Sequence, residues 1–77
     1  MLTIYTTSHC RFCRRLRTNL DRAGIPYTDV DVEQDAAAAD FVTSVNGGNR
    51  ITPTVRFADG TTLTNPTLAE VKKQLAA

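Results

Sequence analysis

The fold of this chain is decided by residues 2–13, which read LTIYTTSHCRFC. Residues 2–6 alternate apolar and polar side chains, which indicates a short β-strand that ends near Ser8. Beyond it, apolar residues recur three and four positions apart, as on the buried stripe of a helix; they are Cys13, Leu16, Leu20 and Ala23. Gly24 is typical of the position that ends such a helix. We therefore expect a strand followed directly by a helix, with two cysteines at their junction.

A second strand and a second helix are expected next. The strand begins within residues 25–27. Two aspartates and two valines then alternate through residue 32, so we expect the valine side of the strand to be buried and the aspartate side to face solvent. Asp35 is suited to cap the helix, which the Asn-Gly-Gly-Asn segment at residues 46–49 ends. The apolar face expected of this helix consists of Ala38, Phe41, Val42 and Val45.

A hairpin and a third helix complete the chain. Residues 54–57 and 61–64 read as two strands around Asp59-Gly60, a hairpin turn signal. The last helix should begin after Thr67, because Glu70 three residues later completes a capping-box pattern. Its expected apolar face is Leu68, Val71 and Leu75. The order β-α-β-α-β-β-α predicts a single α/β domain over residues 1–77, with a four-stranded mixed sheet and helices on both faces.

Composition narrows the class of protein. Nine Lys and Arg balance eight Asp and Glu for a formal net charge of +1, which argues against a protein that coats nucleic acid or an anionic membrane. The sequence has no signal-peptide pattern and no apolar run long enough to cross a bilayer, so we expect a cytoplasmic protein. Thiols are kept reduced there, and a close cysteine pair is then more typical of redox or metal chemistry than of a structural disulfide.

Cys10 and Cys13 form a C-x-x-C motif at the start of a helix, a context typical of thioredoxin-like redox sites. Residues three apart in a helix's first turn have Cβ atoms about 5–6 Å apart, near enough for a reversible disulfide. Cysteines at helix N-termini titrate at roughly 3.5–7.5 instead of ~8.5, so Cys10 should be largely thiolate. Cys10 is expected to attack a substrate disulfide, and either Cys13 or a low-molecular-weight thiol then resolves the product.

Cations flank this motif. Arg11, Arg14 and Arg15 lie at the helix end where positive charge is disfavoured. They indicate either an anionic environment, formed by the thiolate and a substrate carboxylate, or a solvated basic face that balances the acids of residues 29–40. A protonated His9 would also stabilise the thiolate.

A metal site is the alternative to a redox site at these residues. A closed zinc site needs four ligands, and the sequence has no Cys or His besides His9, Cys10 and Cys13, so no metal is expected. An iron–sulfur cluster shared between two chains needs only Cys10 and external thiols, and it stays open as an alternative.

Several segments occur together, in an order typical of one known family. They are TSHCRFC (7–13), GIPY (24–27), VDVE (30–33), SVNGGNR (44–50), PTV (53–55), FADG (57–60) and LTNP (63–66). Together they resemble the glutaredoxin family, most closely the mycoredoxins, over essentially the whole chain. The resemblance implies a thioredoxin fold of the minimal glutaredoxin type and the reduction of protein–mycothiol mixed disulfides. Mycothiol would be the electron-donating cosubstrate, with its NADPH-dependent disulfide reductase as an indirect partner, no bound cofactor, and a monomeric protein.

The same resemblance implies a groove for the substrate thiol beside Cys10. Pro53 would be a cis-proline facing Cys10, and Phe12 would take the place usually held by a Tyr. Thr67 would match a helix-start residue whose backbone N–H holds a substrate carboxylate. The expected substrate-binding residues are therefore His9, Arg11, Phe12, Thr52, Pro53 and Thr67.

The groove departs from the mycoredoxin pattern in three places. His9 stands where a Trp or similar large residue is usual, Arg11-Phe12 replaces a Gly-Tyr or Pro-Tyr pair, and Ile51-Thr52 replaces Thr-Val. Because these positions line the groove, the electron donor stays open among mycothiol, glutathione and direct reduction by thioredoxin reductase.

Overall fold

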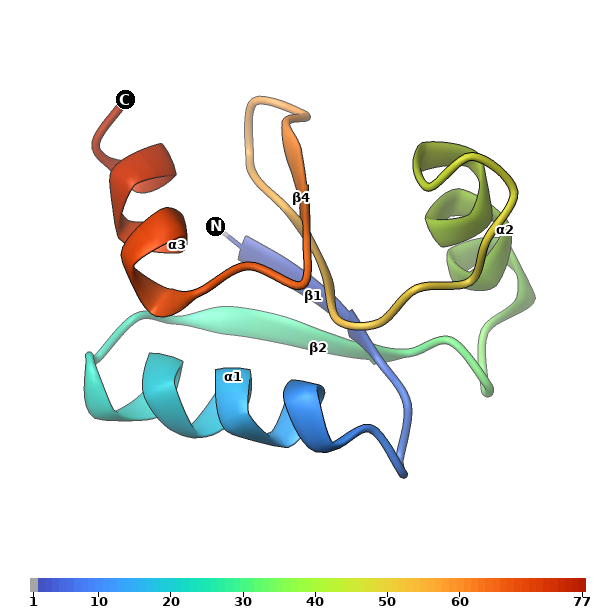
Figure 1. Ribbon diagram of the computed structural model, residues 1–77, viewed down its shortest axis with the longest axis horizontal. Helices are drawn as coiled ribbons and strands as arrows, with labels where there is room; N and C mark the ends of the chain where they lie inside the picture. Colours follow the sequence, from blue (N-terminus) through green and yellow to red (C-terminus); the bar gives the residue numbers. More distant parts are fainter. Residues whose placement is uncertain (1) are drawn as a thin grey trace.

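The computed structural model describes residues 2–77 as one mixed sheet with three helices (Figure 1). The four strands lie in the order β2-β1-β3-β4. They are β1 (Leu2–Thr6), β2 (Tyr27–Asp31), β3 (Thr54–Arg56) and β4 (Thr62–Thr64). β1 pairs in parallel with β2 and antiparallel with β3, and β3 pairs antiparallel with β4. The expected parallel unit and hairpin are therefore confirmed, with β1 in the interior of the sheet.

The helices cover both faces of this sheet, as the sequence predicted. They are α1 (Arg11–Arg22), α2 (Ala36–Val45) and α3 (Leu68–Leu75). On the α1 and α3 face the buried core consists of Leu2, Ile4, Leu16, Leu20, Val55, Phe57 and Val71. On the α2 face it consists of Tyr5, Val32, Ala38, Ala39 and Val42. Because successive side chains of a strand point to opposite faces, β1 is packed from both sides, and the strand that leads to the cysteines is held firmly.

The ends of the helices follow the signals in the sequence. Gly24 follows α1 with φ 69°, in the left-handed region that favours glycine. The Asp35 side chain caps α2 by accepting a hydrogen bond from the Ala38 N–H at 3.1 Å, and Thr67 caps α3 in a capping box with Glu70. None of the helices in residues 2–77 is both long and apolar enough to span a membrane.

Three predicted core positions are wrong. Ala23, predicted on the buried stripe of α1, is exposed because it is the C-cap residue that follows the helix. Val45 and Leu75 are exposed over 38% and 47% of their surface. Each is the last residue of its helix, so no following turn covers it. On the α2 face the buried position is Ala39 instead.

Candidate active site

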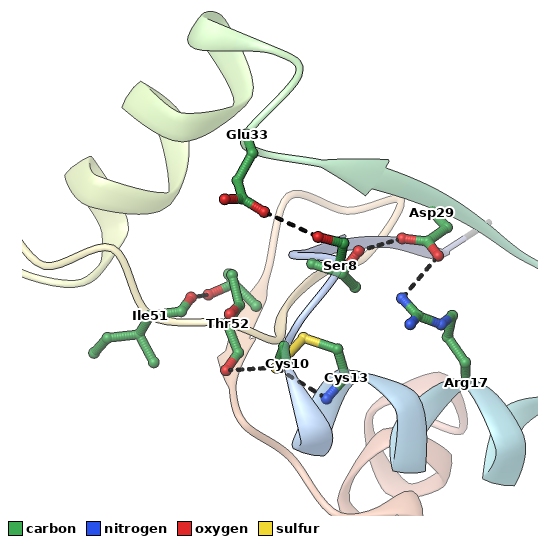
Figure 2. Close-up of a disulfide and its surroundings, with 10 residues drawn as sticks. Ser8, Cys10, Cys13, Arg17, Asp29, Glu33, Ile51 and Thr52 are labelled. Atoms are coloured by element: carbon green, nitrogen blue, oxygen red, sulfur yellow. Dashed lines mark hydrogen bonds and ion pairs between the residues drawn. A yellow bond between two sulfur atoms is a disulfide. The ribbon is translucent and has the colours of Figure 1, made fainter.

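The two cysteines lie at the N-terminus of α1 and are joined by a disulfide (Figure 2). Cys10 is the N-cap residue, with extended backbone angles, and its Cα lies 5.2 Å from that of Cys13. The Cys13 N–H donates a hydrogen bond to Cys10 Sγ at 3.1 Å. Cys13 is 0% exposed, whereas Cys10 is only partly buried. The sulfur that a partner can reach is therefore that of Cys10.

The segment that leads into β3 lies opposite this sulfur. The Thr52 carbonyl oxygen is 3.6 Å from Cys10 Sγ (Figure 2), and the Thr52-Pro53 peptide bond is cis. In the disulfide neither sulfur carries a proton, so this is a contact; a reduced Cys10 thiol has a proton to donate to that oxygen. The Pro53 carbonyl accepts a hydrogen bond from the Asn65 N–H at 2.8 Å. Thr52 therefore lies next to Cys10, and Pro53 follows it across a cis peptide bond.

A polar network that the sequence did not reveal holds this segment in place. The Asn46 side chain donates to the Val42 carbonyl at 2.8 Å and to Thr54 Oγ1 at 3.1 Å. It accepts from the Thr64 hydroxyl at 2.5 Å. The Thr54 hydroxyl, in a side chain that is 0% exposed, donates to the Ile51 carbonyl at 2.7 Å. Asn46 therefore joins the end of α2 to both strands of the hairpin and, through Thr54, to the turn before Pro53.

A second network, between α1 and β2, fixes the direction of α1. The buried Thr6 hydroxyl donates to Asp29 Oδ1 at 2.6 Å, and Arg17 pairs with Asp29 Oδ2 at 3.0 Å (Figure 2). Asp29 thus binds the end of β1 and the second turn of α1 at once. The alternation of residues in β2 predicts only that Asp29 faces solvent. No local pattern identifies Thr6 and Arg17 as its two partners.

Phe12 and Thr67 come together across a cleft between α1 and the start of α3. The cleft has a volume of about 260 Å³ and is lined by Phe12, Arg15, Leu16, Asn19, Asn65, Pro66, Thr67 and Leu68. The Phe12 ring is 52% exposed, and the Arg15 guanidinium lies 6.0 Å from its centroid. A groove of mixed polar and apolar lining therefore begins at the second residue after Cys10.

The backbone N–H of Thr67 is not free to bind a substrate carboxylate. It donates to Glu70 Oε1 at 2.9 Å, and the Glu70 N–H donates to Thr67 Oγ1 at 3.1 Å. The hydrogen bond from the Thr67 N–H is the main cause that lowers the pKa of Glu70 from its usual 4.5. A carboxylate that binds this N–H must first displace Glu70.

The other two predicted groove residues are His9 and Arg11. His9 and Arg11 are exposed, and within residues 2–77 neither forms a hydrogen bond or an ion pair through its side chain. Within the same part of the chain, no three side chains of His, Cys, Asp or Glu gather where they could hold a metal ion. The disulfide between Cys10 and Cys13 is the redox-competent group of this site.

Several known proteins are similar to this chain in sequence. The glutaredoxin family model matches residues 2–61. A Mycobacterium tuberculosis protein named "Putative glutaredoxin Rv3198A" is 62% identical over 74 residues, which are 96% of this chain and 88% of that protein. Mycoredoxin 1 of Corynebacterium glutamicum is 51% identical over 76 residues, 99% of this chain and 94% of that protein.

Solved structures agree on the fold. The glutaredoxin of Methanosarcina mazei superposes with a TM-score of 0.83 at 20% identity, over 99% of this chain and 78% of its own. A buckwheat glutaredoxin–glutathione complex superposes with a TM-score of 0.71 at 21% identity, over 95% of this chain and 68% of its own. The protein thus has a thioredoxin fold and carries a C-x-x-C redox pair. With the family match and the two relatives, this chain belongs to the glutaredoxin family, whose members are thiol–disulfide oxidoreductases.

Proposed function

We propose that this protein reduces mixed disulfides between proteins and mycothiol, with Cys10 as the nucleophile. The observation that carries the proposal is the asymmetry of the cysteine pair: Cys10 Sγ is accessible at the N-cap of α1, and Cys13 is fully buried behind it. The choice of mycothiol is supported by the 51% identity with Mycoredoxin 1 over nearly the whole chain.

Reduction of the disulfide leaves Cys10 Sγ where a thiolate is favoured. The Cys13 N–H already points at it from 3.1 Å, and the positive end of the α1 dipole adds to that attraction. A hydrogen bond to an ionised acceptor is shorter and about twice as strong as one to a neutral acceptor. The Thr52 carbonyl acts in the opposite sense, but from the longer distance of 3.6 Å. The net effect favours an activated Cys10.

The reaction begins with attack of the Cys10 thiolate on the mycothiol sulfur of the mixed disulfide. The substrate protein leaves as a thiolate, and Cys10 becomes joined to mycothiol. A second mycothiol then releases mycothiol disulfide and returns Cys10 to the thiolate. Alternatively, the Cys13 thiol attacks Cys10 Sγ, which releases mycothiol and forms the Cys10–Cys13 disulfide of this structure. Cys13 acts only inside the protein because no part of it is exposed.

The cleft beside Phe12 is the place for the thiol's remaining atoms. It is lined by Phe12, two residues after Cys10, and by Thr67, and Arg15, Asn19 and Asn65 supply polar groups along it. Glutathione carries two carboxylates, and one of them at the Thr67 N–H would have to displace Glu70. The hydrogen bond between the Thr67 N–H and Glu70 therefore supports a thiol donor that does not bind to Thr67 through a carboxylate. His9, Arg11, Thr52 and Pro53 complete the proposed binding surface around Cys10.

The test is NADPH consumption with a small mixed disulfide as substrate under three separate electron supplies. These are mycothiol with its reductase, glutathione with its reductase, and thioredoxin reductase alone. The proposal expects turnover with mycothiol and little with the other two. Preference for glutathione or thioredoxin reductase would overturn the choice of donor, and visible absorbance after anaerobic purification would favour a cluster-binding protein.

We further propose that the protein acts as a cytoplasmic monomer, without a resident cofactor.

A further inference from the structure

Arginines without an acidic partner gather near the accessible sulfur. Arg11, Arg14 and Arg15 are all exposed in the first two turns of α1, and the first turn of this helix contains no acidic residue. The only ion pair within residues 2–77 joins Arg17 to Asp29, further along the helix. Cations near a helix N-terminus are unfavourable, so the fold retains these arginines without an acidic side chain of its own to neutralise them.

A fourth arginine belongs to the segment that lies opposite Cys10. Arg50 is exposed and lies two residues before Thr52, whose carbonyl oxygen is 3.6 Å from Cys10 Sγ. The acids of the neighbouring region lie on and after β2, where Glu33 accepts a 3.4 Å hydrogen bond from Ser8 (Figure 2). We call the four arginines the basic rim; they are Arg11, Arg14, Arg15 and Arg50.

We propose that the basic rim docks polypeptide substrates whose reacting disulfide is flanked by acidic residues. A substrate must place a sulfur at Cys10, and the residues beside that sulfur then pass over the rim. Exposed apolar surface is also present there: Phe12 follows Cys10 by two residues, and Ile51 is 37% exposed in the segment opposite. An acidic chain with some apolar side chains matches both features. A nucleic acid has no sulfur to offer, and the acids of β2 would repel so uniform a polyanion.

The inference rests on the proposed thiol chemistry but adds which substrates are preferred. Opposite charges around a reacting pair raise the rate of productive encounter by about 10- to 1000-fold at low salt, and the effect falls with ionic strength.

The reaction of the reduced protein with such a substrate needs no external reductant, because the dithiol itself is oxidised to the Cys10–Cys13 disulfide. The substrate disulfide is reduced to two thiols, one on the peptide and one on the small group that it carried.

The experiment uses three peptides that differ only in the residues flanking one cysteine, which is held in a mixed disulfide with 2-mercaptoethanol. The flanks are aspartate, serine or lysine. Pre-reduced, desalted protein is mixed with each peptide at about 0.15 M ionic strength, and the released peptide thiol is followed after acid quenching. We expect the aspartate peptide to react about tenfold faster than the lysine peptide, and the ratio to shrink in about 0.5 M NaCl.

Two charge reversals on the same helix locate the effect. Arg14→Glu and Arg22→Glu change the net charge equally at exposed arginines, but Arg22 lies about 12 Å further along α1. The Debye length at this ionic strength is about 8 Å, so the distant charge is largely screened. Arg14→Glu should reduce the aspartate-over-lysine ratio to about twofold, and Arg22→Glu should leave it near tenfold.

The outcomes separate this inference from the proposed function. Equal rates for the three peptides, or equal effects of both charge reversals, would overturn docking on the basic rim while leaving disulfide reduction intact. A DNA duplex that blocks the reaction at the same salt concentration would overturn the assignment to polypeptides. Failure to reduce even the serine peptide would instead contradict the proposed thiol chemistry. Because each ratio is measured within one variant, partial unfolding cannot imitate the expected result.

Discussion

Replacing Asn46 by alanine should destabilise the protein far more than its place in a glycine-rich turn suggests. The substitution removes three hydrogen bonds, with the Val42 carbonyl and the hydroxyls of Thr54 and Thr64 as partners. At about 0.5–1.5 kcal/mol each, and with water able to replace some of them at this partly exposed site, the loss is about 2–3 kcal/mol. For a domain of this size, that lowers the melting temperature by about 10–20 °C.

Asn49 provides a matched control in the same turn. Its side chain is exposed and makes a single 3.3 Å hydrogen bond to the Asn46 carbonyl, so Asn49→Ala should cost no more than about 0.5 kcal/mol. Urea unfolding of the oxidised forms, fitted with a common slope, measures both values. If Asn46→Ala proved no less stable than Asn49→Ala, the network around Pro53 would not be the support that the distances indicate.

The other predictions concern the sulfur pair, the α3 cap and the α1 anchor. Cys10→Ser should abolish reduction of mixed disulfides in the NADPH-coupled assay, whereas Cys13→Ser should retain turnover on thiol mixed disulfides; activity in the first variant would reverse the assigned roles. Glu70 has a lowered pKa in the folded state, so its contribution to stability is present above its usual pKa of 4.5 and is lost as the pH falls through the lower folded value. The difference in melting temperature between wild type and Glu70→Gln should therefore be seen at pH 7 and shrink as the pH falls below 4.5, and a constant difference would refute it. Asp29→Ala should cost about 2 kcal/mol because it leaves a buried hydroxyl without its acceptor, and Arg17→Ala only about 0.5 kcal/mol because that ion pair is exposed. Equal losses in urea unfolding would contradict this order.

The order of the elements could be predicted because its signals are local. The alternation in residues 2–6 and the cap at Asp35 each depend on a few neighbouring side chains. In the structure, β1 and α2 lie at the positions that these signals predict. The C-x-x-C pair could be placed at a helix N-terminus for the same reason. Val45 and Leu75 were misplaced because periodicity carries no information on where the packing against a helix ends.

The supports of the site could not be predicted, because they join residues distant in sequence. Asn46 bonds to Thr64, 18 positions away, and Thr6 bonds to Asp29, 23 positions away. Asparagine at a helix end and aspartate on a strand are common on protein surfaces, and only the folded arrangement supplies their partners. Sequence patterns therefore located the cysteine pair but not the hydrogen bonds that support it.

Thr67 illustrates a conflict between two expectations at one residue. The capping box with Glu70 is a local signal, and the structure confirms it. The role of the same N–H in binding a substrate carboxylate came from family resemblance. Both roles need the same proton, and in the folded chain the Glu70 carboxylate takes it at 2.9 Å.

The most direct test of the central claim is to trap the first intermediate. The Cys13→Ser variant retains Cys10 as its only thiol, because the sequence has two cysteines. Mixed with a peptide that carries mycothiol in disulfide linkage and analysed by intact mass spectrometry, it should gain the mass of mycothiol as the free peptide thiol appears. An unmodified protein, or one that gains the mass of the peptide, would contradict attack of Cys10 on the mycothiol sulfur.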